Sequence, residues 1–239
     1  MKKLRPSGGY RLLASFQTTT IIYDATVWFC DRFLDARSRT VDQMIQAARS
    51  GRQNIAEGSR ASATSTESEL KLVNVARASL EELLLDFEDF LRHKRMRLWD
   101  RDSDESRQVR QVASGHPELS VLSDSDRWHL YALWLEHESP EVRANAIICL
   151  IHQANFLLDQ QVGRLEQDFI QHGGYREQLN AARLEHRTQQ AGDDSPRCPA
   201  CGALMSVRTA RSGNRRGSQF WGCVKYPGCT GTVPIDRSD

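Results

Sequence analysis

The most strongly patterned part of this sequence is residues 66–91, TESELKLVNVARASLEELLLDFEDFL. Its apolar side chains recur at steps of three and four residues, which is the period of one face of an amphipathic helix. The members of this stripe are Leu70, Val73, Leu80, Leu83 or Leu84, Phe87, and Phe90 or Leu91. Thr66 and Glu69 have the spacing of a capping box, so we expect a long helix to open there.

Three further stretches carry helical spacing: residues 16–34, residues 41–57, and a stretch that starts with Ser139 as N-cap and Pro140 and ends at Gly173. The members of these stripes are Phe16, Thr20, Tyr23, Val27, Cys30 and Phe33 or Leu34; Val41, Met44, Ala48, Gly51 and Ile55; and Ile147, Leu150, Ala154, Leu157, Leu165 and Phe169. Four long stripes joined by loops favour an antiparallel four-helix bundle.

The connections between these helices differ in length. Gly58 is expected to follow the second helix as its C′ residue, and the Ser/Ala/Thr-rich residues 59–65 to form a loop. Residues 94–139 form a much longer connection, in which only residues 126–137, DRWHLYALWLEH, indicate a short helix. Cys149, like Cys30, falls on an apolar stripe and is expected to be a buried thiol.

Length and composition indicate one domain of ordinary size with a small appendage. The chain has 239 residues, a mass of 27.2 kDa and a mean hydropathy of −0.56. No uncharged apolar stretch approaches the roughly 18 residues that span a bilayer, and the basic start lacks the apolar core of a secretory signal. We therefore expect a cytoplasmic protein without a membrane partner, in a compartment that keeps thiols reduced.

The remaining four cysteines lie together near the C-terminus, as Cys198-x2-Cys201 and Cys223-x5-Cys229. Four thiolates in two close pairs are the ligand set of a closed, tetrahedral structural zinc site. Disulfides and a redox role are the alternatives, and a reducing compartment disfavours disulfides. The spacing predicts one Zn²⁺ per chain, which supplies stability that a segment of about forty residues with few apolar groups lacks.

These patterns together predict an all-α four-helix bundle with a small C-terminal β zinc ribbon. We expect the bundle over residues 10–174, with an insertion at about 94–139. A polar helical extension and linker should follow over residues 175–195, and the ribbon over residues 196–235.

Charge is distributed unevenly between these parts. From residue 196 onward there are seven Lys/Arg against Asp236 and Asp239, a balance of +5, whereas the preceding 25 basic and 29 acidic residues leave −4. No carboxylate side chain occurs between Arg197 and Ile235. A basic surface for a polyanionic partner is therefore expected in the ribbon.

The ribbon resembles the C-terminal four-cysteine zinc ribbons of bacterial type IA DNA topoisomerases. The resemblance covers residues 198–233 and rests on CPACGALMSVR at 198–208 and GSQFWGCVKYPGCTGT at 217–232. In that family the ribbon binds single-stranded DNA and does not cleave it. The resemblance therefore implies a nucleic-acid partner, with single-stranded DNA favoured.

The residue types of the ribbon agree with that expectation. Aromatic rings offer faces on which bases stack, and Lys and Arg meet phosphates. The candidate nucleic-acid contacts are Arg208, Arg211, Arg215, Arg216, Phe220, Trp221, Lys225 and Tyr226. The alternative is that the aromatic rings cover the zinc, a role that Phe220 in particular could fill.

The bundle resembles the four-helix proteins encoded in intervening sequences of bacterial 23S ribosomal RNA genes, a family that includes the accessory variability determinant of diversity-generating retroelements. The resemblance rests on residues 43–62, QMIQAARSGRQNIAEGSRAS, with Asn54, Glu57 and Gly58, and on the stretch that ends at residue 91. It implies a homo-oligomer, with a pentamer favoured, and a nucleic-acid enzyme as a possible partner. From the residues alone, Asn54 and Glu57 are as readily explained as structural groups that pin the end of a helix.

No catalytic motif stands out, because a phosphate-binding GxxxxGK[ST] loop, HExxH and GxSxG are all absent from the sequence. We therefore predict a non-enzymatic, oligomeric nucleic-acid-binding adaptor, in which the ribbon contacts DNA and the bundle assembles. Trp28, Trp128 and Trp134, taken as exposed, are candidate assembly contacts. The alternatives are a protein-interaction scaffold and an accessory subunit of a nucleic-acid enzyme.

Overall fold

The computed structural model describes residues 9–62, 65–190, 195–212 and 216–235. It confirms the predicted fold class, a helical bundle followed by a small antiparallel sheet. The chain divides into two compact units, Met1–His172 and Gly173–Asp239. Among the described residues, no helix combines the length and apolar character that crossing a bilayer requires.

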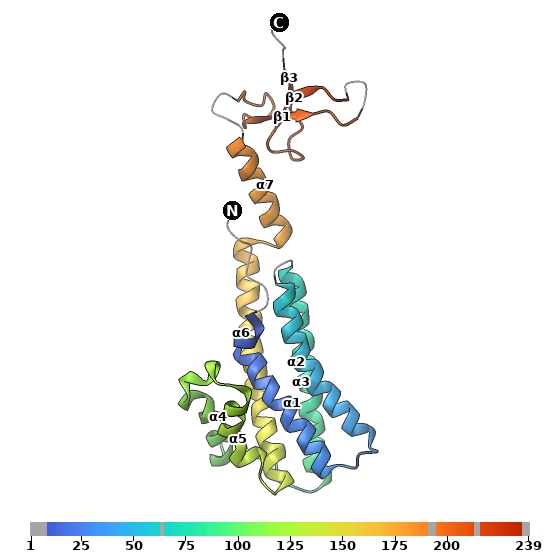
Figure 1. Ribbon diagram of the computed structural model, residues 1–239, viewed down its shortest axis with the longest axis vertical. Helices are drawn as coiled ribbons and strands as arrows, with labels where there is room; N and C mark the ends of the chain where they lie inside the picture. The colour runs from blue at the N-terminus through green and yellow to red at the C-terminus, as the bar shows by residue number, and fades with distance from the viewer. Residues whose placement is uncertain (1–8, 63–64, 191–194, 213–215, 236–239) are drawn as a thin grey trace. The chain divides into compact units, whose positions relative to one another are not determined.

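The bundle is made of four long helices that follow one another around the core. A short 3-10 helix, η1 (Gly9–Leu12), precedes them. The four helices are α1 (Ala14–Phe33), α2 (Arg39–Ala61), α3 (Thr66–His93) and α6 (Pro140–His172). Packing runs in the cyclic order α1, α2, α3, α6, with neighbours antiparallel (Figure 1).

Aromatic and small residues shape the core of this bundle. The ring of Phe29 is fully buried and meets the rings of Phe87 and Phe90 at centroid distances of 5.1 and 4.9 Å. Gly51 lets α2 approach α3, because a Cβ atom there would lie 2.9 Å from the Leu80 side chain. Most residues of the predicted apolar stripes are buried. The prediction that Phe169 faces the core was wrong, because this residue, near the end of α6, is 46% exposed.

The α2–α3 connection is shorter than predicted. Helix α2 continues through Gly58 to Ala61, so Gly58 is not a C′ residue but a buried contact point. A Cβ atom there would lie 3.4 Å from the Glu69 carbonyl oxygen and from Leu72 Cβ on α3. The N-cap of α3 is Ser65 rather than Thr66, and its hydroxyl accepts a hydrogen bond of 3.1 Å from the Ser68 N–H. The interior of α2 tolerates Gly58 because close packing against α3 offsets the low helix propensity of glycine.

The insertion is structured where the sequence indicated mostly a loop. It contains α4 (Asp104–Gly115), the 3-10 helix η2 (Pro117–Val121) and α5 (Asp124–Leu135). Val109 of α4 and Tyr131 and Leu135 of α5 are buried in the core of the bundle. Helix α4 was missed because its charged residues dominate the local pattern, and Val109 is its one fully buried apolar side chain.

Two of the three tryptophans expected at the surface are partly buried instead. Trp128 and Trp134 pack against the bundle core, while Trp28 is 53% exposed. The rings of Trp28 and Trp128 are in contact, with centroids 5.0 Å apart. The two buried thiols were predicted correctly, since Cys30 and Cys149 both lie in the core.

The second unit contains a polar helix and the small sheet. Gly173 follows α6 with a φ of 70°, a left-handed conformation that suits glycine and stops the helix as expected. Helix α7 spans Tyr175–Gln190. The strands are β1 (Met205–Thr209), β2 (Gln219–Cys223) and β3 (Thr232–Pro234), antiparallel and in that order.

Candidate metal centre and nucleic-acid interface

The four tail cysteines are carried by two tight turns on one side of the sheet. In the first turn, the Cys198 N–H donates to the Ala203 carbonyl and the Gly202 N–H to the Cys198 carbonyl, both at 2.8 Å. In the second, Cys223 ends β2 and its carbonyl accepts from the Tyr226 N–H at 3.2 Å, which turns the chain toward Cys229. Each turn therefore delivers a pair of sulfur atoms to the same place.

The geometry of the sulfur atoms fits a tetrahedral zinc ion. All four lie within 4.8 Å of one another. The Cys198–Cys229 and Cys201–Cys223 pairs are separated by 3.7 and 3.5 Å. Two sulfurs at about 2.3 Å from one tetrahedrally coordinated Zn²⁺ are about 3.8 Å apart, whereas a disulfide brings them to about 2.0 Å. None of the four forms a disulfide, so that alternative is wrong, and the spacing of the sulfur atoms identifies the cluster as a zinc site.

Gly231 belongs to this centre, although no motif in the sequence indicated it. A Cβ atom at this position would overlap the Cys198 sulfur. Its carbonyl also accepts a 3.0 Å hydrogen bond from the Cys223 N–H. The glycine in the short segment after Cys229 is the only sequence signal for it, and glycine is too common in such turns to be singled out.

Protonation of the thiols competes with metal binding. Burial works to raise the pKa of Cys198, but hydrogen bonds from the backbone of Ala200 and Cys201 and from the Cys229 and Cys201 side chains together outweigh it and lower that pKa to about 7. Burial is the main influence that raises the pKa of Cys223 to about 12. Because zinc binds thiolates, it must displace a proton from Cys223 at neutral pH, and zinc affinity falls as the pH falls.

The strand register assigns the ribbon's side chains to two faces of the sheet. Met205 lies opposite Cys223, and Trp221 lies opposite Val207 on one side and Val233 on the other. Directly opposed residues share a face, so these side chains form one surface, here called the metal face. Trp221 packs there against Cys198, Met205 and Cys223. The ring that covers the metal centre is therefore that of Trp221, not that of Phe220.

The other surface, here called the open face, carries Arg208, Phe220 and Tyr226. Arg208 lies opposite Phe220 in the β1–β2 register. Its guanidinium lies 5.1 Å from the centroid of the Tyr226 ring, and it donates a 3.0 Å hydrogen bond to the Cys223 carbonyl. Gly222 makes room for it, because a Cβ atom there would lie 2.7 Å from Arg208 Cδ. Phe220 is half-buried and Tyr226 is 52% exposed, so the surface presents ring area to solvent.

The other predicted contacts lie outside the three strands. Arg211 and Arg216 are exposed in the segment between β1 and β2, and Lys225 is exposed in the turn after Cys223. Arg215 lies outside the described residues. In the bundle, Asn54 is half-buried, Glu57 is exposed and Gly58 packs against α3.

Asn54 acts within its own helix. Its amide donates to the carbonyl and to the hydroxyl oxygen of Ser50, at 2.9 and 3.1 Å. The Ser50 hydroxyl in turn accepts a 3.0 Å hydrogen bond from Ser79 of α3. Asn54 therefore has a structural role, in which it holds the Ser50 hydroxyl that links α2 to α3.

Comparison with protein-family models adds an independent finding about the tail. Residues 196–238 match the model of the topoisomerase DNA binding C4 zinc finger. The match covers the zinc-binding part and does not extend to a catalytic domain. With the four clustered cysteines, this zinc ribbon points to nucleic-acid binding.

No curated protein and no solved structure matches the chain. The resemblance of the bundle to the intervening-sequence family therefore remains a prediction.

Proposed function

We propose that this protein binds single-stranded nucleic acid, with DNA favoured, through the open face of its zinc ribbon. The observation that supports this most is the row formed by Phe220, Arg208 and Tyr226 on the side of the sheet that faces away from the zinc. Two aromatic rings and a guanidinium offer a platform for successive bases, and stacking tolerates any base. Trp221 is not part of this platform because it packs against the metal centre.

The phosphates of the strand would meet the exposed cations in the segments that connect the strands of the ribbon. Arg211, Arg216 and Lys225 are all exposed, and no carboxylate side chain lies within residues 195–235 to oppose them. Cations without nearby carboxylates release counterions from the phosphates, which makes binding strongly dependent on salt.

The bundle would assemble several chains, so that one strand engages several ribbons. The resemblance of the bundle to the intervening-sequence family favours a pentamer, and in this proposal the protein acts as a non-enzymatic adaptor. Light scattering of the full-length protein tests the assembly, and a monomer at micromolar concentration would overturn it.

Binding to a labelled single-stranded oligonucleotide, measured at several salt concentrations, tests the proposed interface. Phe220→Ala and Tyr226→Ala should each weaken binding by roughly 5- to 150-fold, the equivalent of about 1–3 kcal/mol per stacked base. Val207→Ala is the matched control, because Val207 is 48% exposed but lies on the metal face. Zinc content should be unchanged in all three variants.

Replacing Arg211 and Arg216 by Gln should reduce the slope of log affinity against log salt by roughly 0.7 per lost phosphate contact. If the full-length protein ignores oligonucleotides even at low salt, the ribbon instead docks on a protein, and the scaffold function is correct.

A further inference from the structure

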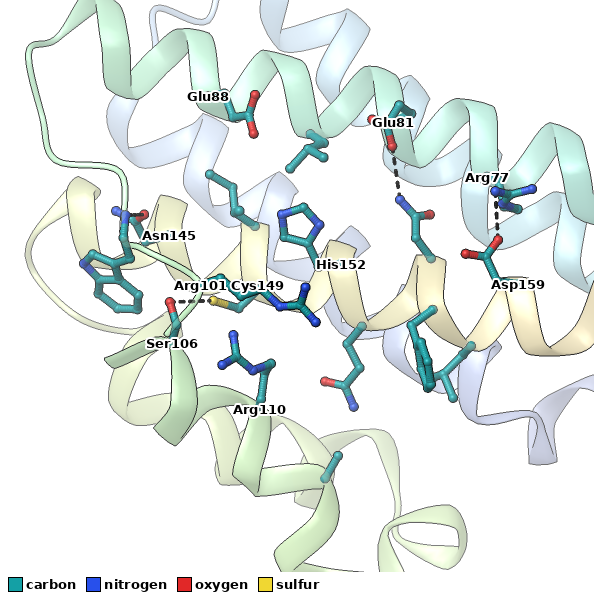
Figure 2. Close-up of a pocket in the computed structure, with 18 of the residues that line it drawn as sticks. Arg77, Glu81, Glu88, Arg101, Ser106, Arg110, Asn145, Cys149, His152 and Asp159 are labelled. Carbon is teal, nitrogen blue, oxygen red and sulfur yellow. Dashed lines mark hydrogen bonds and ion pairs between the residues drawn. The ribbon is translucent and has the colours of Figure 1, made fainter. Parts of the chain in front are cut away.

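The bundle unit contains a groove whose lining residues all belong to that unit. The groove has a volume of about 1220 Å³ and is lined by α3, α4, α6 and the segment that leads into α4 (Figure 2). Pockets that bind small molecules commonly enclose about 300–1,000 Å³. The groove is therefore large enough for a ligand of nucleotide size.

Hydrogen bonds hold the walls of this groove in place. Asn145 of α6 accepts from the Trp99 N–H at 2.7 Å and donates to the Arg97 carbonyl at 2.9 Å. The Cys149 sulfur of α6 lies 3.6 Å from the Ser106 hydroxyl of α4. The unexpected helix α4 is thus fastened to α6, which gives the groove a formed outer wall.

Some of the charged groups in the groove are already paired. Arg77 forms an ion pair of 2.8 Å with Asp159, and Glu81 accepts a 3.3 Å hydrogen bond from the Asn155 amide. These contacts join α3 to α6 along one end of the groove (Figure 2).

The remaining charges have no such partners. Within the part of the chain that the structure describes, neither Arg101 nor Arg110 forms an ion pair or hydrogen bond, and the same holds for Glu88. Figure 2 shows Arg110 extending from α4 and Arg101 from the preceding segment into the same region, while Glu88 projects from α3 on the opposite side. The groove therefore has two unpaired cationic side chains on one side and one unpaired carboxylate on the other.

Two buried acceptors add to this unsatisfied polarity. Gln153 Oε1 and Asn155 Oδ1 are buried, line the groove and accept no hydrogen bond among the described residues. Leaving a buried acceptor unsatisfied costs roughly 1–3 kcal/mol, so a ligand that donates to it would be favoured.

We propose that this groove binds a nucleotide. Arg101 and Arg110 would hold its phosphate, because paired guanidinium forks match phosphate oxygens. Sugar hydroxyl or base amino groups would donate to Glu88 and to the amide oxygens of Gln153 and Asn155. Trp99, Ile148 and Phe156 supply the apolar surface that a base covers. Inorganic phosphate would satisfy the two arginines only and would leave Glu88 without a donor.

Equilibrium dialysis of the full-length protein against ATP, AMP, adenosine and inorganic phosphate tests this site. We expect one nucleotide per chain, with adenosine and phosphate each bound at least tenfold more weakly than AMP. Arg101→Gln should weaken AMP binding at least tenfold, and because Arg101 is exposed its replacement leaves the fold intact. Arg110→Gln should have a similar effect, and Glu88→Gln should reduce the preference for AMP over phosphate.

Arg107→Gln is the matched control, because Arg107 is an exposed arginine of α4 that pairs with Asp104 at 2.6 Å and does not line the groove. It should leave AMP binding unchanged, as should Phe220→Ala in the ribbon. Absence of nucleotide binding at about 1 mM, or equal binding by Arg101→Gln, would overturn the site. Loss of AMP binding in Phe220→Ala would place the nucleotide on the ribbon and also overturn it.

Discussion

Arg208 stacks over Tyr226, with its guanidinium 5.1 Å from the ring centroid, while it donates a hydrogen bond of 3.0 Å to the Cys223 carbonyl. This one side chain connects the open face of the ribbon to a zinc ligand. A planar guanidinium can stack and donate at the same time, whereas an ammonium is a point charge that cannot match both.

Arg208→Lys is therefore expected to weaken single-strand binding although it keeps the charge. The loss should be several-fold, because Tyr226 is no longer held by the stacked guanidinium. The dependence of affinity on salt should stay the same, and this separates Arg208 from a simple phosphate contact. Oligonucleotide titrations at two salt concentrations measure both quantities, and an affinity equal to that of the unmodified protein would refute the positioning role.

Gly231→Ala should weaken zinc binding roughly tenfold or more, because the added methyl group would displace the Cys198 sulfur. Competition with a chromophoric chelator measures the affinity. Thr230→Ala, at the exposed neighbouring position, serves as the control and should retain full affinity.

Alkaline pH should destabilise the bundle through Cys30. Burial, aided by the charge of Asp86, raises the pKa of this thiol from 9.0 to about 12. Because the folded state holds the proton more tightly, this stabilising contribution is complete below about pH 9 and is lost as the pH rises toward 12. Urea unfolding at pH 7 and pH 10 should show a loss of stability that is smaller in Cys30→Ala. An unchanged loss in that variant would assign the effect to other groups, of which Tyr131 is the first to consider, since burial also raises its pKa to about 12.

Phe29→Ala should lower the free energy of unfolding of the bundle by about 3–5 kcal/mol, because it opens a cavity between α1 and α3 where three rings meet. Phe156→Ala is the control on α6, since Phe156 is 61% exposed and should change stability little. Chemical denaturation followed by circular dichroism measures both variants. Similar losses in the two variants would contradict the assigned core.

Strand length should control affinity if the bundle assembles the ribbons. A single ribbon offers few contacts, so full-length protein should bind an oligonucleotide of a few bases weakly. Tethering several ribbons on one strand can strengthen binding by roughly 10²–10⁴, so a strand long enough to span them should bind far more tightly. Fluorescence anisotropy with short and long oligonucleotides tests this, and affinity that rises only in proportion to length would argue against assembly.

The sequence alone determined the features that depend on local spacing. Helical periodicity located the four bundle helices, because a residue's neighbours at three and four positions along the chain define the buried face. The spacing of the four cysteines located the zinc site for a similar reason, since each pair is delivered by a tight turn of a few residues. The prediction that Gly51 lies on the buried face of the second helix was correct, because local spacing is enough to place it there.

Only the tertiary structure decided features that depend on register and on contacts between distant segments. Phe220 and Trp221 are neighbours on a strand and point to opposite faces, but only the structure shows that this strand runs unbroken to Cys223, which puts Trp221 on the side of the metal centre. Helix α4 is anchored largely by Val109, so its burial depends on α6 and not on its own pattern. Arg101, Arg110 and Glu88 come from separate segments, and only the packing of α3, α4 and α6 brings them around one groove.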